Sequence, residues 1–327
     1  MMIKIAEILR PVTHVPGMKI PIPGSPLILH VFPALLRVYR GAEVIQEIEL
    51  AISGPVKEFT AQLDLVKGCI NVWGRSQKGY FRYSVFGGES QVQLKFAKAP
   101  KGLQDIGADF PHYIPENIER LSLGSHKSQD WHGVVQRGDL VEILPVWYQL
   151  GQMMPEVEQN SKGGTFSLLK SDIESFKQLW LAGFEGMMSP RLEDTDHQGF
   201  QLPVVDQNLS PLPLLSQGWK VIRQMFFEES SEVLTILPHL PKEFHCGRLV
   251  GVKTDDHLTI NIEWTKKQLR RMEIVSGSDT ERQIVFPKGL KSYRLRNRKT
   301  EKGKRVSIDK ILRLENGKSV ILDNFKK

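Results

Sequence analysis

The chain is poor in cysteine and has no long apolar run. Cys69 and Cys246 are the two cysteines in 327 residues, and neither stands in a CxxC pair. A disulfide framework and a structural zinc site therefore have no support, and we expect a reducing, cytoplasmic location. No stretch approaches the roughly 20 apolar residues that cross a bilayer, and the first residues lack the pattern of a secretory signal. We expect no membrane association.

Short motifs that mark common kinds of active site are absent as well. The sequence contains no GxSxG, GxxxxGK[ST], GxGxxG or HExxH. These patterns serve a serine nucleophile, a nucleoside triphosphate, a dinucleotide and a catalytic zinc ion, respectively. We therefore expect neither a cofactor nor a metal site.

Positive charge is concentrated near the C-terminal end. The net charge is +7, and residues 288–305 hold nine cations against one acidic residue. Tyr293 and Leu295 alternate with Arg294 and Arg296, which is the two-residue period of a half-exposed strand. We expect solvated strands, whose cations also oppose edge-to-edge aggregation. Binding to nucleic-acid phosphates is the less favoured alternative, because no nucleic-acid-binding motif accompanies the charge. The nine cations are Lys288, Lys291, Arg294, Arg296, Arg298, Lys299, Lys302, Lys304 and Arg305.

Both ends of the chain have the pattern of β-structure. In residues 1–105, short apolar runs alternate with glycine and proline, which predicts an antiparallel sandwich. One run places Phe81, Tyr83 and Val85 at every second position, so one face of that strand can be buried. From residue 231 to 327 such runs return, and LTINIEW alternates in the same way. We predict a β-sandwich domain over each of these ranges.

Residues 106–230 change to a helical period. Asp139 can cap a helix with one apolar stripe, and Ser171 and Glu174 have the spacing of a capping box before another. A further amphipathic helix is predicted at about residues 214–228. The predicted fold class is therefore α+β, mainly β, with two β-sandwich domains separated by a short helical region.

Residues 218–276 resemble the closing part of glycoside hydrolase family 95, the α-L-fucosidase type. In that family an amphipathic helix leads into a strand, an LP-x-LP turn, a glycine-containing strand, and a strand that ends in an acidic residue and tryptophan. The counterparts here are Leu237-Pro238, Leu240-Pro241, Val250-Gly251-Val252 and Ile262-Glu263-Trp264. The resemblance implies a terminal β domain of this type and a carbohydrate context.

The resemblance does not carry the family's catalytic machinery. Family members hold their catalytic carboxylate in a large all-helical barrel, whereas about 115 residues separate the two β regions here. A complete barrel cannot fit, so no catalytic residue is transferred. We expect a hydrolase-like protein that binds a glycan or a protein partner without catalysis. Two alternatives stay open: a protein-interaction scaffold with no ligand, and a reduced glycoside hydrolase.

The richest local supply of carboxylates lies in an irregular connection before the last helix. Hydrolysis of a glycosidic bond needs two carboxylates that flank a cleft. Glu193, Asp194 and Asp196 are therefore candidate catalytic residues, and His197 is a candidate binding residue. Solvated loop residues are the competing interpretation. The run Asp255-Asp256-His257 is instead predicted to form a hairpin turn, which aspartate favours.

A second candidate group lies in the run SHKSQDWH. His126 and Asp130 are four residues apart, on one face of a predicted helix, and Trp131 is beside them. Pairs with this spacing can share a metal ion, but no third ligand is identifiable, so we predict no metal site. We take His126, Asp130 and Trp131 as candidate binding residues. The alternative is that the polar residues lie on a helix surface and the tryptophan lies in the core.

Overall fold

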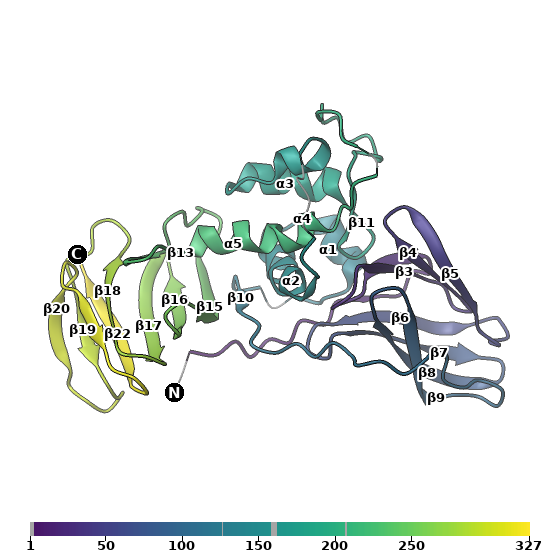
Figure 1. The fold of residues 1–327 in the computed structure, drawn as a ribbon, viewed down its shortest axis with the longest axis horizontal. Coiled ribbons are helices and arrows are strands. Elements are labelled where there is room, and N and C mark those ends of the chain that lie inside the picture. The colour runs from purple at the N-terminus through teal and green to yellow at the C-terminus, as the bar shows by residue number, and fades with distance from the viewer. Residues whose placement is uncertain (1–2, 126, 158–161, 207) are drawn as a thin grey trace.

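The chain folds into an elongated molecule with β-structure at both ends and helices between them (Figure 1). The computed structural model describes residues 3–125, 127–157, 162–206 and 208–327. Most strand pairs are antiparallel, and more residues lie in strands than in helices. The predicted class is confirmed: the fold is α+β, mainly β, with two β-sandwiches separated by a short helical region.

Two antiparallel sheets form the N-terminal sandwich. The side chains of Phe81, Tyr83 and Val85 on β8 are buried, while Arg82 between them is exposed, as the two-residue period predicts. One sheet has the order β2 (Met18–Pro21), β3 (Leu27–Val31), β4 (Leu35–Arg40), β5 (Glu43–Glu49). The other has the order β1 (Val12–Thr13), β6 (Lys57–Asp64), β7 (Cys69–Ser76), β8 (Gly79–Gly87), β9 (Val92–Lys98).

The helical region packs between the two sandwiches. Its elements are α1 (Trp131–Arg137), α2 (Leu140–Met153), the short 3-10 helix η1 (Gly164–Leu168), α3 (Ile173–Gly183), α4 (Pro213–Ser216) and α5 (Gly218–Phe226). A two-stranded ribbon, β11 (Phe184–Glu185) and β12 (Ser189–Pro190), follows α3. No described helix is both long and apolar enough to cross a membrane.

An aspartate is the N-cap residue of each of the helices α1, α2 and α3. The Asp139 carboxylate caps α2 by accepting the N–H of Val141 at 3.0 Å, as predicted. The predicted capping box at α3 is wrong by one residue. Asp172, not Ser171, is the cap, and its carboxylate accepts the N–H of Ser175 at 2.9 Å. The helix predicted at residues 214–228 is two helices, α4 and α5, and its last residues belong to a strand.

The C-terminal sandwich also pairs a larger and a smaller sheet. The seven-stranded sheet has the order β10 (Arg120–Ser122), β15 (Cys246–Lys253), β16 (Leu258–Thr265), β17 (Gln268–Ser276), β22 (Ser319–Lys326), β19 (Ser292–Arg296), β20 (Lys304–Ser307). The four-stranded sheet has the order β13 (Phe227–Glu229), β14 (Val233–Ile236), β18 (Thr280–Val285), β21 (Leu312–Leu314). Strands β10 and β13 come from residues 106–230, the range predicted to be helical. The domain boundaries near residues 105 and 230 stay a prediction.

Trp264 anchors the C-terminal core. Its side chain is fully buried, its Nε1 donates to the carbonyl oxygen of Phe244 at 3.2 Å, and its ring stacks on that of Phe226 with centroids 5.3 Å apart. Gly247 lies against the indole: a Cβ atom there would come within 2.2 Å of a ring carbon. Trp264, which ends one strand of the family pattern, therefore serves packing.

The first described residues run from the C-terminal sandwich to the N-terminal one beneath the helices (Figure 1). The N–H of Ile3 donates to Glu273 on β17 at 2.6 Å, and Arg120 donates to the carbonyl oxygen of Ile5 at 3.1 Å. Val12 then pairs with Gln62 on β6. One short segment thus ties both sandwiches together.

A buried ion pair joins the helices to the C-terminal sandwich. Glu119, which is 6% exposed, precedes β10, and its carboxylate accepts the Arg223 Nε at 3.1 and 3.2 Å. The Tyr148 hydroxyl on α2 and the N–H of Lys253 on β15 donate to the same carboxylate. Because a buried charge needs its partners, α2, α5 and β15 are held in one arrangement.

Glu119→Gln should destabilise the protein by about 3 kcal/mol, because it leaves the half-buried Arg223 guanidinium without its counter-ion. Urea unfolding followed by circular dichroism measures the change. Glu156→Gln is the matched control, since Glu156 pairs with Lys220 while 75% exposed, and the loss there should stay below about 1 kcal/mol. Equal losses in both variants would contradict the role given to Glu119.

Candidate functional site

A groove opens where α1 and α3 meet β2 and the ribbon β11–β12. We call it the α1–α3 groove; its volume is about 340 Å³. Residues far apart in the sequence meet here, because α1 and α3 pack through their tryptophans and the 191–198 loop folds back over the end of α3. The lining residues are Met18, Trp131, His132, Val135, Trp180, Leu181, Phe184, Glu185, Gly186, Asp196 and Gln198.

Two tryptophans form the floor of the groove. The rings of Trp131 and Trp180 meet edge to face, with centroids 5.8 Å apart. Trp131 Nε1 donates to the carbonyl oxygen of Gly186 at 2.6 Å. Trp131 is fully buried and Trp180 is 7% exposed. The rings therefore hold α1, α3 and β11 together, and the accessible apolar surface comes from Val135 and Leu181, which are 48% and 47% exposed.

Arg191 positions the loop that carries Asp196. Its guanidinium donates to the carbonyl oxygens of Ala182 at 2.7 Å and Leu181 at 2.9 Å. Carbonyls in the last turn of a helix have no partner within the helix, and Arg191 supplies one. It also binds the Asp196 carboxylate at 2.7 Å. The Arg191 side chain is 7% exposed, whereas that of Asp196 is 60% exposed. One buried cation thus fixes a carboxylate at the rim of the groove.

The structure separates the candidate carboxylates of the 191–198 loop. Asp196 lines the groove, while Glu193 and Asp194 do not. The Asp194 carboxylate accepts the N–H of Gln198 at 3.0 Å and so shapes the loop. His197 is exposed, has a positive φ of 53°, and also lies outside the groove lining. Only one of the three candidate catalytic residues therefore reaches the groove.

The candidates around α1 have different surroundings. Trp131 is the first residue of α1 and lies in the groove floor. Asp130 is the N-cap, and its carboxylate accepts the N–H of His132 at 3.2 Å. His126 lies outside the described residues. His132, next to the candidates, lines the groove and lies 3.0 Å from the side-chain amide of Gln136.

Some groove residues had no signal in the sequence. Glu185 is the last residue of β11, and its carboxylate pairs with Lys19 on β2 at 2.8 Å. Gln198 reaches the groove only because Arg191 and Asp194 fold the loop. Lys19 and Glu185 lie in short strands 166 positions apart, so no local sequence pattern could connect them.

Both carboxylates at the rim of the groove are held in ion pairs. Glu185 pairs with Lys19 at 2.8 Å, and Asp196 pairs with Arg191 at 2.7 Å. Among the described residues, no group of three or more His, Cys, Asp or Glu side chains is placed to hold a metal ion.

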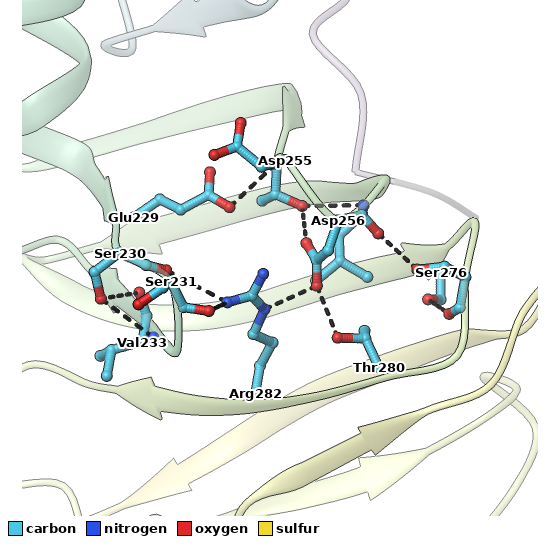
Figure 2. A network of polar contacts seen from close by, with 12 residues as sticks. Glu229, Ser230, Ser231, Val233, Asp255, Asp256, Ser276, Thr280 and Arg282 are labelled. Carbon is cyan, nitrogen blue, oxygen red and sulfur yellow. Dashed lines mark hydrogen bonds and ion pairs between the residues drawn. The ribbon is translucent and has the colours of Figure 1, made fainter.

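A polar network outside the groove lies in the C-terminal sandwich (Figure 2). Asp256, in the predicted turn between β15 and β16, accepts hydrogen bonds from Arg282 Nε at 2.8 Å and Thr280 Oγ1 at 2.9 Å. Arg282 also donates to the carbonyl oxygens of Ser230 and Ser231. The network ties the β15–β16 turn to β18 and to the β13–β14 turn.

Hydrogen bonding sets the ionisation of Asp256. Burial by itself would raise the pKa of its carboxyl group, but the hydrogen bonds from Arg282, Thr254 and Thr280 outweigh it and hold the pKa at about 2. Nearby, burial raises the pKa of Glu229, whose carboxylate accepts the N–H of Asp255 at 3.2 Å. The closed set of partners around Asp256 makes this network a structural one.

The Asp256 network should make the C-terminal sandwich sensitive to acid. Because the folded pKa lies below the unfolded value of about 3.9, the stabilisation of about 2 kcal/mol is complete above that value and is lost as the pH falls toward 2. Asp256→Asn should remove it at pH 7 and flatten the acid limb of a stability-against-pH curve. Thr280→Val should move that limb to higher pH. Curves parallel to the wild type would contradict this assignment.

Arg191→Lys should loosen the 191–198 loop, because the single ammonium nitrogen of lysine cannot span the three acceptors that the guanidinium reaches from three separate nitrogens. We expect cleavage after Glu193 by a glutamate-specific protease to become several-fold faster. Arg298→Lys, at an exposed turn, is the control and should leave the rate unchanged. An unchanged rate in Arg191→Lys would mean that the loop is held by other contacts.

Comparison with known protein families gives a match within the C-terminal sandwich. Residues 230–319 match the family model of the glycoside hydrolase family 95, C-terminal domain. No curated protein matches the chain. The matched range contains the Asp256 network and most strands of the C-terminal sandwich, and it covers less than a third of the chain. The predicted resemblance is confirmed: the C-terminal region is of the glycoside hydrolase family 95 type, and the protein is related to glycoside hydrolases.

Proposed function

We propose that the protein binds a glycan in the α1–α3 groove without cleaving it. The observation that carries the proposal is the composition of that groove. Exposed Val135 and Leu181 lie beside His132, Gln198 and the carboxylate of Asp196. The relationship of residues 230–319 to a glycoside hydrolase domain supports a carbohydrate ligand.

A sugar fits this mixture of groups. Its ring offers apolar C–H faces together with hydroxyl groups that both donate and accept hydrogen bonds. The apolar rim can cover the faces, while an imidazole, an amide and a carboxylate bind the hydroxyls. The oxygens of Glu185 and Asp196 can accept hydrogen bonds from sugar hydroxyls. The groove therefore supplies contacts for recognition.

Absence of turnover is part of the proposal. Glycoside hydrolysis needs two carboxyl groups placed on the two sides of the scissile bond. The two carboxylates of the α1–α3 groove are each engaged in an ion pair with a residue of a neighbouring segment. We expect no hydrolysis of aryl fucosides or of the bound glycan.

A protein partner is the second candidate for the same groove. The specific observation is that Val135 and Leu181, two large apolar side chains, are about half exposed on one rim. This alternative corresponds to a scaffold without a sugar ligand. If this alternative is correct, Leu181→Ser abolishes association with the protein partner, and no sugar raises the unfolding midpoint of the protein.

Two further expectations belong to this proposal. A cytoplasmic location is supported by Cys69 and Cys246, which are both free. The division into an N-terminal β domain, a helical middle and a C-terminal β domain at residues 105 and 230 is supported by the order of the elements, with β10 and β13 of the middle range joining the C-terminal sheets.

A thermal-shift titration against mono- and oligosaccharides tests glycan binding. A ligand that binds only the folded state raises the unfolding midpoint, by the equivalent of about 2.7 kcal/mol at a concentration of 100 Kd. We expect a saturable rise for at least one sugar, which His132→Ala and Gln198→Ala reduce. The matched controls His245→Ala and Gln201→Ala, which lie outside the groove, should respond like the wild type.

No rise for any sugar would reject glycan binding and leave the scaffold alternative. A rise that survives in both groove variants would place the sugar elsewhere on the protein. Release of free sugar from the bound glycan would contradict the proposal and support the alternative of a reduced glycoside hydrolase.

A further inference from the structure

We propose that the N-terminal sandwich binds single-stranded nucleic acid on the outer face of its five-stranded sheet. The site is formed by the outward side chains of β7, β8 and β9 together with the first residue of β6, and we call it the β7–β9 face. This sheet lies at the end of the molecule farthest from the C-terminal sandwich (Figure 1). The α1–α3 groove borders the other sheet of the sandwich, through Met18 on β2. The inference goes beyond the proposed function and does not depend on it.

Two partly exposed aromatic rings lie on the β7–β9 face. Tyr80 on β8 is 36% exposed, and Trp73 on β7 is half-buried. Arg82, two residues after Tyr80, lies directly opposite Trp73, with its guanidinium carbon 5.6 Å from the centroid of the Trp73 ring. Tyr80 and Trp73 are therefore diagonal neighbours, and such positions lie about 7–8 Å apart on one face of a sheet. Bases of single strands stack on aromatic rings and on arginine planes, so the face offers neighbouring stacking positions.

Three cations beside these rings have no ion-pair partner among the described residues. They are Lys57, Arg82 and Lys98, and all three are exposed. Lys98 on β9 lies opposite Arg82, while Lys57 on β6 lies opposite Arg75, which in turn lies opposite Tyr80. Because cross-strand partners share one face of a sheet, the cations lie on both sides of the strands that carry the rings.

The carboxylates of this part of the sandwich are already engaged. Strand β6 carries Glu58 and Asp64, and each forms an ion pair, at 3.0 and 3.1 Å respectively. Strands β7, β8 and β9 contain no acidic residue. In the loop after β9, Asp109 pairs with Lys95 at 3.4 Å, and Asp105 accepts a backbone N–H of β9 at 2.7 Å. The face therefore carries an excess of unpaired cations, which complements the phosphates of a nucleic acid.

The polar side chains in the middle of the sheet favour a nucleic acid over a glycan. Ser84 Oγ donates to Asn71 Oδ1 at 2.7 Å, and Asn71 Nδ2 donates to the side-chain oxygens of Gln62 and Asp64 at 3.4 Å. These groups bind one another, whereas a glycan site directs amides and carboxylates at sugar hydroxyls. Each nucleotide instead brings one flat ring and one phosphate, which matches the rings and cations of the face. Only a single strand can use the rings, because the bases of a duplex are stacked inside it.

The basic run at residues 288–305 lacks this combination. Arg294 and Arg296 both bind the Asp323 carboxylate, the former at 2.7 Å. Tyr293, the aromatic residue of the run, is 1% exposed. Neither its ring nor these two arginines are available to bases, so the β7–β9 face is the better site for a single strand.

Fluorescence anisotropy of the full chain with a labelled single strand tests the inference. The probe is mixed-sequence DNA of about 15 nucleotides, within the usual range of site sizes, and the competitors are its duplex and heparin, an acidic glycan. The charge variant is Arg82→Ala with Lys98→Ala. Its matched control, Lys304→Ala with Lys310→Ala, removes two exposed lysines of the C-terminal sandwich that have no ion pair among the described residues. Unfolding midpoints check that each variant is folded.

We expect the single strand to bind more tightly than the duplex or heparin. Three cations on phosphates give a slope of about −2 when the logarithm of the affinity is plotted against that of the salt concentration, between about 50 and 200 mM. The charge variant should reduce the slope to about −0.7 and weaken binding about tenfold. The control should keep the slope of the wild type and an affinity within about twofold of it.

Tyr80 tests the stacking part of the inference. Tyr80→Ala should weaken binding about fivefold or more, whereas Tyr80→Phe keeps the ring and should bind like the wild type. His132→Ala, in the α1–α3 groove, should leave this binding unchanged, which separates the two sites.

Four results would overturn the inference. The first is that the single strand does not bind, or binds less tightly than the duplex. The second is tighter binding of heparin, which would assign the face to an acidic glycan. The third is an equal loss in the charge variant and its control, since only net charge would then matter. The fourth is wild-type affinity in Tyr80→Ala, because no base would then stack on this ring.

Discussion

The carboxylate of Glu119 is the contact on which the arrangement of the molecule depends. It is buried, so its charge must be neutralised inside the protein, and it takes its partners from three elements: Tyr148 on α2, Arg223 on α5 and the backbone of Lys253 on β15. These elements belong to the helical region and to the C-terminal sandwich. Each must be in place for the others to be satisfied, so the ion pair specifies how the helices meet the sheet.

Charged groups elsewhere are also used mainly to hold elements together. Arg191 closes the end of α3 and fixes Asp196, and Asp256 with Arg282 connects two turns and a strand. The same residue types would serve in a catalytic site, where at least one carboxyl group must keep its proton. In this protein their partners are cations and hydrogen-bond donors that belong to neighbouring elements, so these contacts stabilise the fold.

Local patterns predicted local structure well. The alternation of Phe81, Tyr83 and Val85 predicted the inward face of β8, and Asp139 was recognised as a cap, since both depend on neighbours within a few residues. The error at α3 shows the limit of such patterns: Ser171 and Asp172 are both good caps, and the backbone path selects the aspartate. Among the candidate site residues, Trp131 and Asp196 line one groove, whereas Glu193, Asp194 and His197 do not, because side-chain direction within a loop depends on its tertiary contacts.

The sequence by itself determined the fold class, the resemblance of the C-terminal region to a glycoside hydrolase domain, and the position of the basic run, because these follow from periodicity, spacing and composition. Only the tertiary structure decided which charges are free. Arg294 and Arg296 look available in the sequence but are bound to Asp323, about 28 positions further along the chain, while Lys304 and Lys310 stay exposed. The pairing of distant charges depends on which strands become neighbours, and strand order is set by packing of the whole sandwich rather than by any local run of residues.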